Sequence, residues 1–234
     1  MCKIGIYLVC NYPDKDSFIE NVKLCQRYGI DFLEIGLPFS DPVADGAIIE
    51  KASNEALKRY SADDFFESIK KSREIFDGRL YIMTYANLVF GCGIETFAQR
   101  YRFIDGVIIA DVPFVESERF KAVFDKFDTG FVYFATPESS FETLKKIKQK
   151  TNDFIYFVSI RGTTGGEFSL DEDSIERLKF LKGAKHGVIV GFGIKTKEHI
   201  KTACSYADGV VIGSRAVEMA QKGQFEKFLI SIKQ

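Results

Sequence analysis

The feature that most constrains the fold is a repeated alternation between short strand-like runs and longer helix-like segments. Eight runs are rich in β-branched and aromatic residues: 4–9, 31–36, 80–85, 105–110, 130–135, 154–159, 187–191 and 208–213. The segments between them have apolar residues at helical spacing, and in "DSFIENVKLCQRYG" Asp16 is predicted as the N-cap and Gly29 as the stop. Such alternation predicts parallel strands joined by crossover helices.

Eight such units in 234 residues fit an α/β fold of the (β/α)8 TIM barrel type, which typically has about 250 residues. An open doubly wound sheet is the alternative. However, the first strand is followed by "VCNYPD" rather than by the glycine fingerprint of that fold. Neither a linker nor a change of composition divides the chain, so residues 1–234 are predicted to form one barrel domain.

The composition narrows the functional classes. A formal charge of -1 argues against a nucleic-acid partner, and no apolar run is long enough for a signal peptide or a membrane span. The cysteine usage fits a reducing cytoplasm best, so a cytoplasmic protein is predicted. The five cysteines are scattered and lack CxxC spacing, so neither a disulfide framework nor a zinc site is expected. With only two histidines, acid–base chemistry must rest mainly on carboxylates, tyrosine or lysine, and no metal or cofactor is predicted.

An acid inside a strand-like run is the first candidate catalytic group. In "DFLEIG", Glu34 shares a face with Phe32 and Gly36, whereas Leu33 and Ile35 share the other face. The apolar pair suits the helix-facing side of a barrel, so Glu34 is predicted to point inward near the carboxyl end of its strand, where barrel enzymes build active sites. Desolvation should raise its pKa. The alternative is a structural pair with a lysine or arginine, for which nearby inward positions offer no obvious cation.

A second acid, Asp45, lies eleven residues later, in a loop predicted to return over the barrel mouth. Two carboxyl groups in different environments can hold different protonation states, as acid–base catalysis requires. The alternative for Asp45 is a turn-forming role before Gly46. Asp41, before Pro42, fits a structural role better.

Two glycine-rich turns near the C-terminus predict a phosphate site. "VGFGIKT" contains Gly191 and Gly193, and "VVIGSRA" contains Gly213 and Ser214. Glycines at strand-to-helix turns let backbone N–H groups and a helix N-terminus approach a phosphate. Barrels often hold phosphate at the loops after strands seven and eight.

Two further loops carry functional hypotheses. "SIRGTTGGEFS" is glycine-rich and predicts a closing lid from which Thr164 presents a hydroxyl, although a plain solvent-exposed connection is the alternative. "MTYANLVFGCG" carries several apolar residues after the third strand. It predicts either a partner surface or residues covered by the following helix.

Taken together, these motifs resemble the tryptophan synthase α subunit family over nearly the whole chain. The most specific is "LEIGLPFSDPVADG", joined by "YLVCNYPD", "MTYANLVFGCGIETF", "IIADVPFVES", "GTTGGE", "VGFGI" and "DGVVIGSRAVE". The last two are shared with other phosphate-binding barrels. The resemblance implies a lyase that cleaves indole-3-glycerol phosphate to indole and glyceraldehyde 3-phosphate and passes the indole to a β subunit in an α2β2 complex.

The resemblance also implies residue roles. Glu34 and Asp45 match the family's catalytic acids. Positions that match the indole-site walls are Tyr7, Met83, Tyr156 and Phe192, with Thr164 matching the lid threonine that contacts the catalytic aspartate. The matches to the phosphate cradle are Gly165, Gly193, Gly213 and Ser214. The matches to the surface that meets the β subunit are Asp41, Pro42, Asn87, Phe90, Asp111 and Pro113.

The chain also departs from the family pattern. Relatives usually begin with a helix that closes the barrel bottom, whereas here strand one begins within a few residues of Met1, so a barrel lacking that helix is predicted. In the lid, Ile160 stands after Ser159 where relatives often have arginine, Arg161 comes one place later, and Thr163 replaces the usual valine. Three other hypotheses stay open: a self-sufficient indole-releasing lyase, a weakly catalytic subunit that activates β, and another phosphate-binding barrel.

Overall fold

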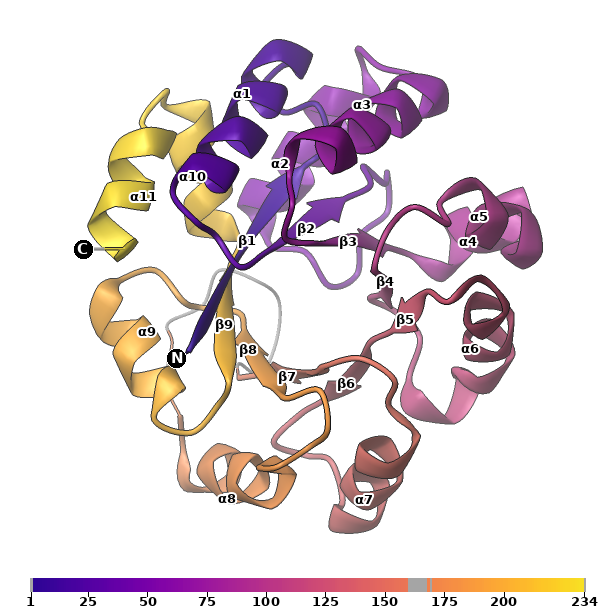
Figure 1. The fold of residues 1–234 in the computed structure, drawn as a ribbon, viewed down its shortest axis with the longest axis vertical. Coiled ribbons are helices and arrows are strands. Elements are labelled where there is room, and N and C mark those ends of the chain that lie inside the picture. Colours follow the sequence, from indigo (N-terminus) through magenta and orange to yellow (C-terminus); the bar gives the residue numbers. More distant parts are fainter. Residues whose placement is uncertain (1, 160–167, 169, 234) are drawn as a thin grey trace.

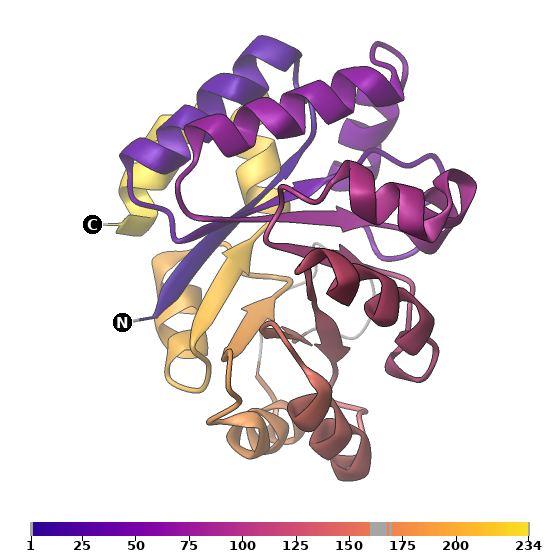
Figure 2. The ribbon, with the colours of Figure 1, turned by 45° about the vertical axis from the view of Figure 1, so that its right-hand side comes forward.

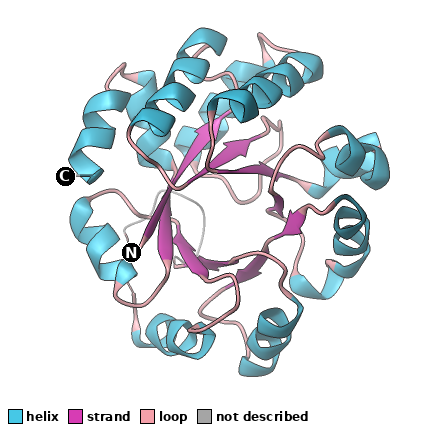
Figure 3. Ribbon diagram, viewed as in Figure 1, coloured by secondary structure: helices cyan, strands magenta, loops and turns pink. Residues whose placement is uncertain are grey.

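In the computed structural model of the chain, a ring of helices surrounds parallel strands, as Figures 1 and 3 show. The structure describes residues 2–159, 168 and 170–233. The strands are β1 Lys3–Val9, β2 Phe32–Gly36, β3 Arg79–Thr84, β4 Gly106–Ile109, β5 Gly130–Phe131, β6 Tyr133–Ala135, β7 Ile155–Val158, β8 Val188–Gly191 and β9 Gly209–Ile212. The predicted (β/α)8 barrel is confirmed, and each predicted run lies within one residue of its observed bounds.

The helices follow the strands in the order that the alternation predicts. They are α1 Lys15–Arg27, α2 Ala47–Leu57, α3 Ala62–Ile75, α4 Ala86–Cys92, α5 Ile94–Arg100, α6 Glu118–Phe124, α7 Phe141–Lys150, α8 Glu172–Leu181, α9 Lys197–Cys204, α10 Ser214–Gln221 and α11 Phe225–Lys233, with the 3-10 turns η1 Phe114–Glu116 and η2 Asp125–Phe127. The first helix packs against the last two, α10 and α11, which closes the outer ring (Figure 2). Within the described residues no helix precedes β1, and none is long and apolar enough to cross a membrane.

The barrel closes through one predicted strand that the structure divides in two. β5 pairs with β4, and β6 pairs with β7, so the two edges of the sheet are joined by Val132. The Val132 N–H still donates to the Val107 carbonyl at 3.1 Å. Phe131 and Tyr133 pack toward the helices while Val132 packs inside, so the side-chain alternation continues even though the hydrogen-bonding partner changes.

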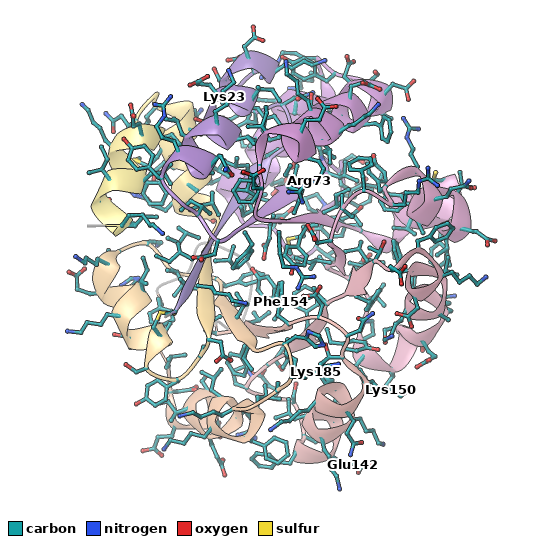
Figure 4. All side chains as sticks on the ribbon, in the orientation of Figure 1. Lys23, Arg73, Glu142, Lys150, Phe154 and Lys185 are labelled. Atoms are coloured by element: carbon teal, nitrogen blue, oxygen red, sulfur yellow. A yellow bond between two sulfur atoms is a disulfide. The ribbon has the colours of Figure 1, made fainter. Side chains whose placement is uncertain are left out.

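Two apolar layers result from this alternation. The larger lies between strands and helices and includes Leu33, Ile35, Ile82 and Val190. The smaller fills the barrel interior and includes Tyr7, Phe32, Tyr81, Phe154 and Tyr156. In Figure 4, Phe154 lies near the middle of the barrel, whereas Lys23, Glu142 and Lys150 lie on the outside. The predicted division of the second strand, with Leu33 and Ile35 toward the helices and Phe32 inside, is confirmed.

The structure differs from the sequence prediction at the start of α1 and at two cysteines. The N-cap of α1 is Asp14 rather than Asp16: its carboxylate accepts from the Ser17 N–H at 2.8 Å, and Asp16 instead lies in the first turn. Cys2 and Cys204 form a disulfide, contrary to the expectation from their spacing. The two residues are 202 positions apart, and the fold alone brings the segment before β1 beside the end of α9.

Candidate active site

Glu34 lies in the middle of β2, enclosed by the barrel. In the strand register it lies between Tyr7 of β1 and Tyr81 of β3, both of which belong to the interior layer. Its side chain is 0% exposed, and neither carboxyl oxygen has a hydrogen-bond partner among the described residues. Burial raises the pKa of Glu34 from 4.5 to about 8. The described residues therefore offer no structural pair with a lysine or arginine, and the group is held near its titration point at neutral pH.

Two tyrosines flank this carboxyl group, and glycines make room for both. A Cβ atom at Gly36 would come within 2.0 Å of the Tyr7 hydroxyl, and one at Gly191 within 2.2 Å of the Tyr156 hydroxyl. The rings can occupy the barrel interior only because these two positions lack side chains. Desolvation is the main cause that raises the pKa of both tyrosines, and the charges of Asp45 and Glu34 add to it, with Asp45 the larger of the two at Tyr7 and Glu34 at Tyr156. Both hydroxyls therefore stay protonated around the buried acid.

Asp45 lies in the loop after β2 and lines the pocket at the barrel mouth. Burial raises its pKa to about 6, while a hydrogen bond from the Tyr85 hydroxyl opposes the shift by stabilising the ionised form. The same hydroxyl accepts from the Ala44 N–H at 3.3 Å, and the Tyr85 ring stacks on Phe39 with centroids 5.0 Å apart. Tyr85 thus holds the loop from two sides and keeps Asp45 ionised at neutral pH. Tyr85 was not among the predicted site residues. Its position at the end of a barrel strand is nevertheless typical of active-site residues in this fold.

A single pocket of about 450 Å³ collects most of the other predicted site residues. It is lined by Tyr7, Asp45, Ile49, Met83, Tyr156, Phe192, Gly193, Ile194, Lys195, Val211, Gly213, Ser214 and Arg215. Its lining combines apolar and aromatic side chains with residues of the two C-terminal turns. Glu34 does not line this pocket and lies enclosed among the strands. Thr164 and Gly165 lie outside the described residues.

The two turns have features of a phosphate seat. Phe192 and Gly193 both have positive φ, at 70° and 76°, and the Ser159 hydroxyl donates to the carbonyls of Gly191 and Phe192 at 3.0 Å. Such left-handed backbone at a non-glycine residue is strained and is retained mainly at functional sites. At the other turn, Ser214 begins α10, and its buried hydroxyl has no partner among the described residues. That helix N-terminus also has no side-chain cap in the described part of the chain, so its backbone N–H groups are available to an anion.

His199, which was not among the predicted site residues, contacts the turn that carries Gly193. Its Nδ1 atom lies 3.3 Å from the Lys195 N–H and 3.3 Å from the Gly193 carbonyl. Its ring lies against Phe168, with centroids 5.2 Å apart. His199 lies in α9 and therefore supports the turn between β8 and α9.

The predicted partner residues follow three neighbouring strands, β2, β3 and β4. Asp41, Asn87, Asp111 and Pro113 are exposed, and Phe90 is 42% exposed although it also packs on Phe120. Pro42 is half-buried. The Asp111 carboxylate accepts from the Ala86 N–H at 2.8 Å and so also caps α4. The segment predicted to be an apolar loop forms the helix α4 instead, in which Val89 is buried and Phe90 is exposed. A partner surface there stays a prediction.

Two exposed apolar residues extend this surface beyond the prediction. Val43 is 69% exposed and Val115 is 79% exposed, in the loops after β2 and β4. Phe90 lies in α4, which follows β3, so the three exposed side chains come from segments that follow three adjacent strands.

Comparison with known proteins agrees with this geometry. The family profile described as "Tryptophan synthase alpha chain" matches residues 4–230. The chain is similar to the tryptophan synthase alpha chain of Caldicellulosiruptor bescii, with 41% identity over 233 residues, 97% of this chain and 89% of that protein. It is similar to that of Aquifex aeolicus, with 38% identity over 226 residues, 94% of this chain and 86% of that protein. The fold is similar to a chain in the tryptophan synthase α2β2 complex of Pyrococcus furiosus, with TM-score 0.88, 29% identity and 99% of both chains covered.

Proposed function

The chain belongs to the tryptophan synthase alpha chain family, and we propose that Glu34, enclosed among the strands, and Asp45, which lines the pocket, carry its reaction. As an α subunit of that family, it is a lyase that cleaves indole-3-glycerol phosphate to indole and glyceraldehyde 3-phosphate. The observation that carries the residue assignment is Glu34: a carboxyl group that is fully buried, has no partner in the described structure and has a pKa of about 8.

Each acid has the protonation state that its step requires. Protonated Glu34 gives its proton to the ring carbon that bears the side chain. Its carboxylate then takes the proton of the side-chain hydroxyl as the carbon–carbon bond breaks, so the acid is regenerated and the side chain leaves as an aldehyde. Ionised Asp45 accepts the ring N–H and stabilises the positive charge that develops there. Two carboxyl groups whose environments hold different protonation states are the expected pattern for such chemistry.

We propose that the two ends of the substrate contact different groups of pocket residues. We assign the indole ring to the walls made by Tyr7, Met83, Tyr156 and Phe192, and the phosphate to the turns around Gly193, Gly213 and Ser214. Thr164 is proposed to contact Asp45 from the lid, and Gly165 is proposed to belong to the phosphate cradle; both lie outside the described residues. The exposed groups around Asp41, Asn87 and Asp111 are proposed to meet a β subunit in an α2β2 assembly, supported by the apolar side chains of Val43, Phe90 and Val115.

Two broader expectations are proposals as well. The unbroken sheet order supports residues 1–234 acting as one barrel domain. A biosynthetic family supports a location in the cytoplasm.

The direct test is an assay of indole release from indole-3-glycerol phosphate, with the chain alone and with a tryptophan synthase β subunit. We expect slow turnover alone and faster turnover with β, because docking favours the closed arrangement of the mouth. A fast isolated chain that does not respond to β would support the self-sufficient lyase. No turnover under either condition would contradict the activity.

Gly213→Asp should abolish the stabilisation that phosphate ligands give. A hundredfold excess of glycerol phosphate over its dissociation constant adds about 2.7 kcal/mol to the free energy of unfolding. For a domain of this size, that raises Tm by about 5–10 °C. A carboxylate at position 213 would repel the ligand. Gly213→Ala is the matched control, because a Cβ there meets nothing closer than 3.8 Å and φ is -102°. A shift in Tm that survives Gly213→Asp would move the phosphate elsewhere.

A further inference from the structure

Two cationic residues connect the phosphate seat with a second depression on the surface. Lys195 and Arg215 line the active-site pocket, and both also line a depression between α9, α10 and α11, here called the α9–α11 groove. Lys197 and Lys227 line that groove as well, against a single acidic lining residue, Glu198. The whole chain has a formal charge of -1, so this positive rim is a local feature.

Arg215 occupies a place where a cation is otherwise unfavourable. It is the second residue of α10, whose first turn contains no acidic residue. The helix macrodipole is positive at that end, so an arginine there is unfavourable unless an anion lies nearby, and the Glu218 carboxylate is the anion it contacts in this structure. The uncapped helix N-terminus and the buried, unpartnered Ser214 hydroxyl point to an anion at this helix start.

Arg215 forms an ion pair with Glu218 that it can exchange for another anion. Its Nη1 atom lies 2.8 Å from one carboxylate oxygen of Glu218, and Lys222 Nζ lies 2.5 Å from the other. If Arg215 turns toward a phosphate, Glu218 keeps Lys222 and is not left unpaired. The Arg215 side chain is 39% exposed, so its present pair is weakly held.

We propose that Arg215 is a specificity-determining residue that exchanges Glu218 for the substrate phosphate, while Lys195 and the α9–α11 groove attract the dianion to the seat. The planar guanidinium matches phosphate oxygens in a bidentate way, so it adds charge recognition to the backbone N–H groups and the Ser214 hydroxyl of the seat. The groove lies beside the seat and concentrates anions at its entrance. This inference rests on the phosphate location given under the proposed function.

The test compares binding of inorganic phosphate and of glycerol 3-phosphate to the full chain by calorimetry. Arg215→Gln should raise both dissociation constants about tenfold, as expected for the loss of a charged hydrogen bond. KM for indole-3-glycerol phosphate should rise by a similar factor while kcat stays within about twofold, because uniform binding is lost. Arg215→Lys should recover part of the affinity, and the wild type should lose more affinity than Arg215→Gln between about 20 and 200 mM salt.

The matched control is Lys201→Gln, an exposed lysine of α9 that lines neither depression. Dissociation constants within twofold of wild type in Arg215→Gln, or an equal rise in Lys201→Gln, would overturn the inference. The parent proposal fails separately: if Gly213→Asp still binds phosphate, the seat itself is misplaced. If Gly213→Asp loses binding and Arg215→Gln does not, only the role of Arg215 is wrong.

Discussion

Glu34→Gln is expected to reduce indole formation by on the order of 10²–10⁴ or more, with the barrel still folded. Glutamine has nearly the same shape as glutamic acid, and the site has no ion pair in its described part that the change would break. What disappears is the proton that must reach the ring carbon and the base that must collect the hydroxyl proton. Turnover is measured with saturating β subunit, and circular dichroism reports the fold. Glu67→Gln, an exposed acid on α3, is the control.

The pH dependence of the wild type tests the same assignment from another side. Asp45 must be ionised, and its pKa is about 6, so kcat/KM should fall as the pH drops through 6. Glu34 must be protonated, and its pKa is about 8, so kcat/KM should fall again as the pH rises through 8. The profile of the free enzyme should therefore be bell-shaped. A folded Glu34→Gln variant with near-normal turnover would falsify the catalytic role.

Much of the fold followed from periodicity alone. The strand-like runs gave strand bounds to within one residue, and the alternation in "DFLEIG" placed Glu34 inside the barrel. Strand bounds can be predicted from periodicity here because the parallel strands are short and buried. One face of each strand also has to pack against helices. Periodicity did not reveal that the run 130–135 changes its pairing partner at Val132, because that change leaves the inward and outward alternation intact.

The parts of the site that sequence reasoning missed depend on contacts between distant segments. Tyr85 holds Asp45 from another loop, and His199 reaches back to the turn at Gly193. The Cys2–Cys204 bond joins residues near opposite ends of the chain. No local spacing encodes such contacts. Arg215, by contrast, stands beside the predicted Ser214, and its position against the helix dipole became informative only when the helix start was known.

Glu34→Gln should also make the protein more stable, and increasingly so as the pH rises. The pKa of Glu34 is raised in the folded state, so the unfolded chain releases this proton first, and folding stability falls as the pH rises from about 4.5 to about 8. The full difference between these pKa values corresponds to about 5 kcal/mol, which is an upper estimate for a fully buried group. At pH 7 the cost is about 3 kcal/mol. Glutamine resembles the neutral acid and does not titrate, so the variant avoids this cost.

The measurement is urea unfolding of wild type and Glu34→Gln at several pH values between 5 and 9. The two free energies should be close at pH 5, where Glu34 is protonated in the fold, and should separate by several kcal/mol by pH 8. Asp45 also has a raised pKa, but it is present in both proteins and cancels in the comparison. Parallel curves would mean that Glu34 has a partner when ionised, and its acid–base role would then lack its physical basis. Diverging curves, together with lost turnover, would show that this barrel gives up stability to keep an ionisable group where the reaction needs it.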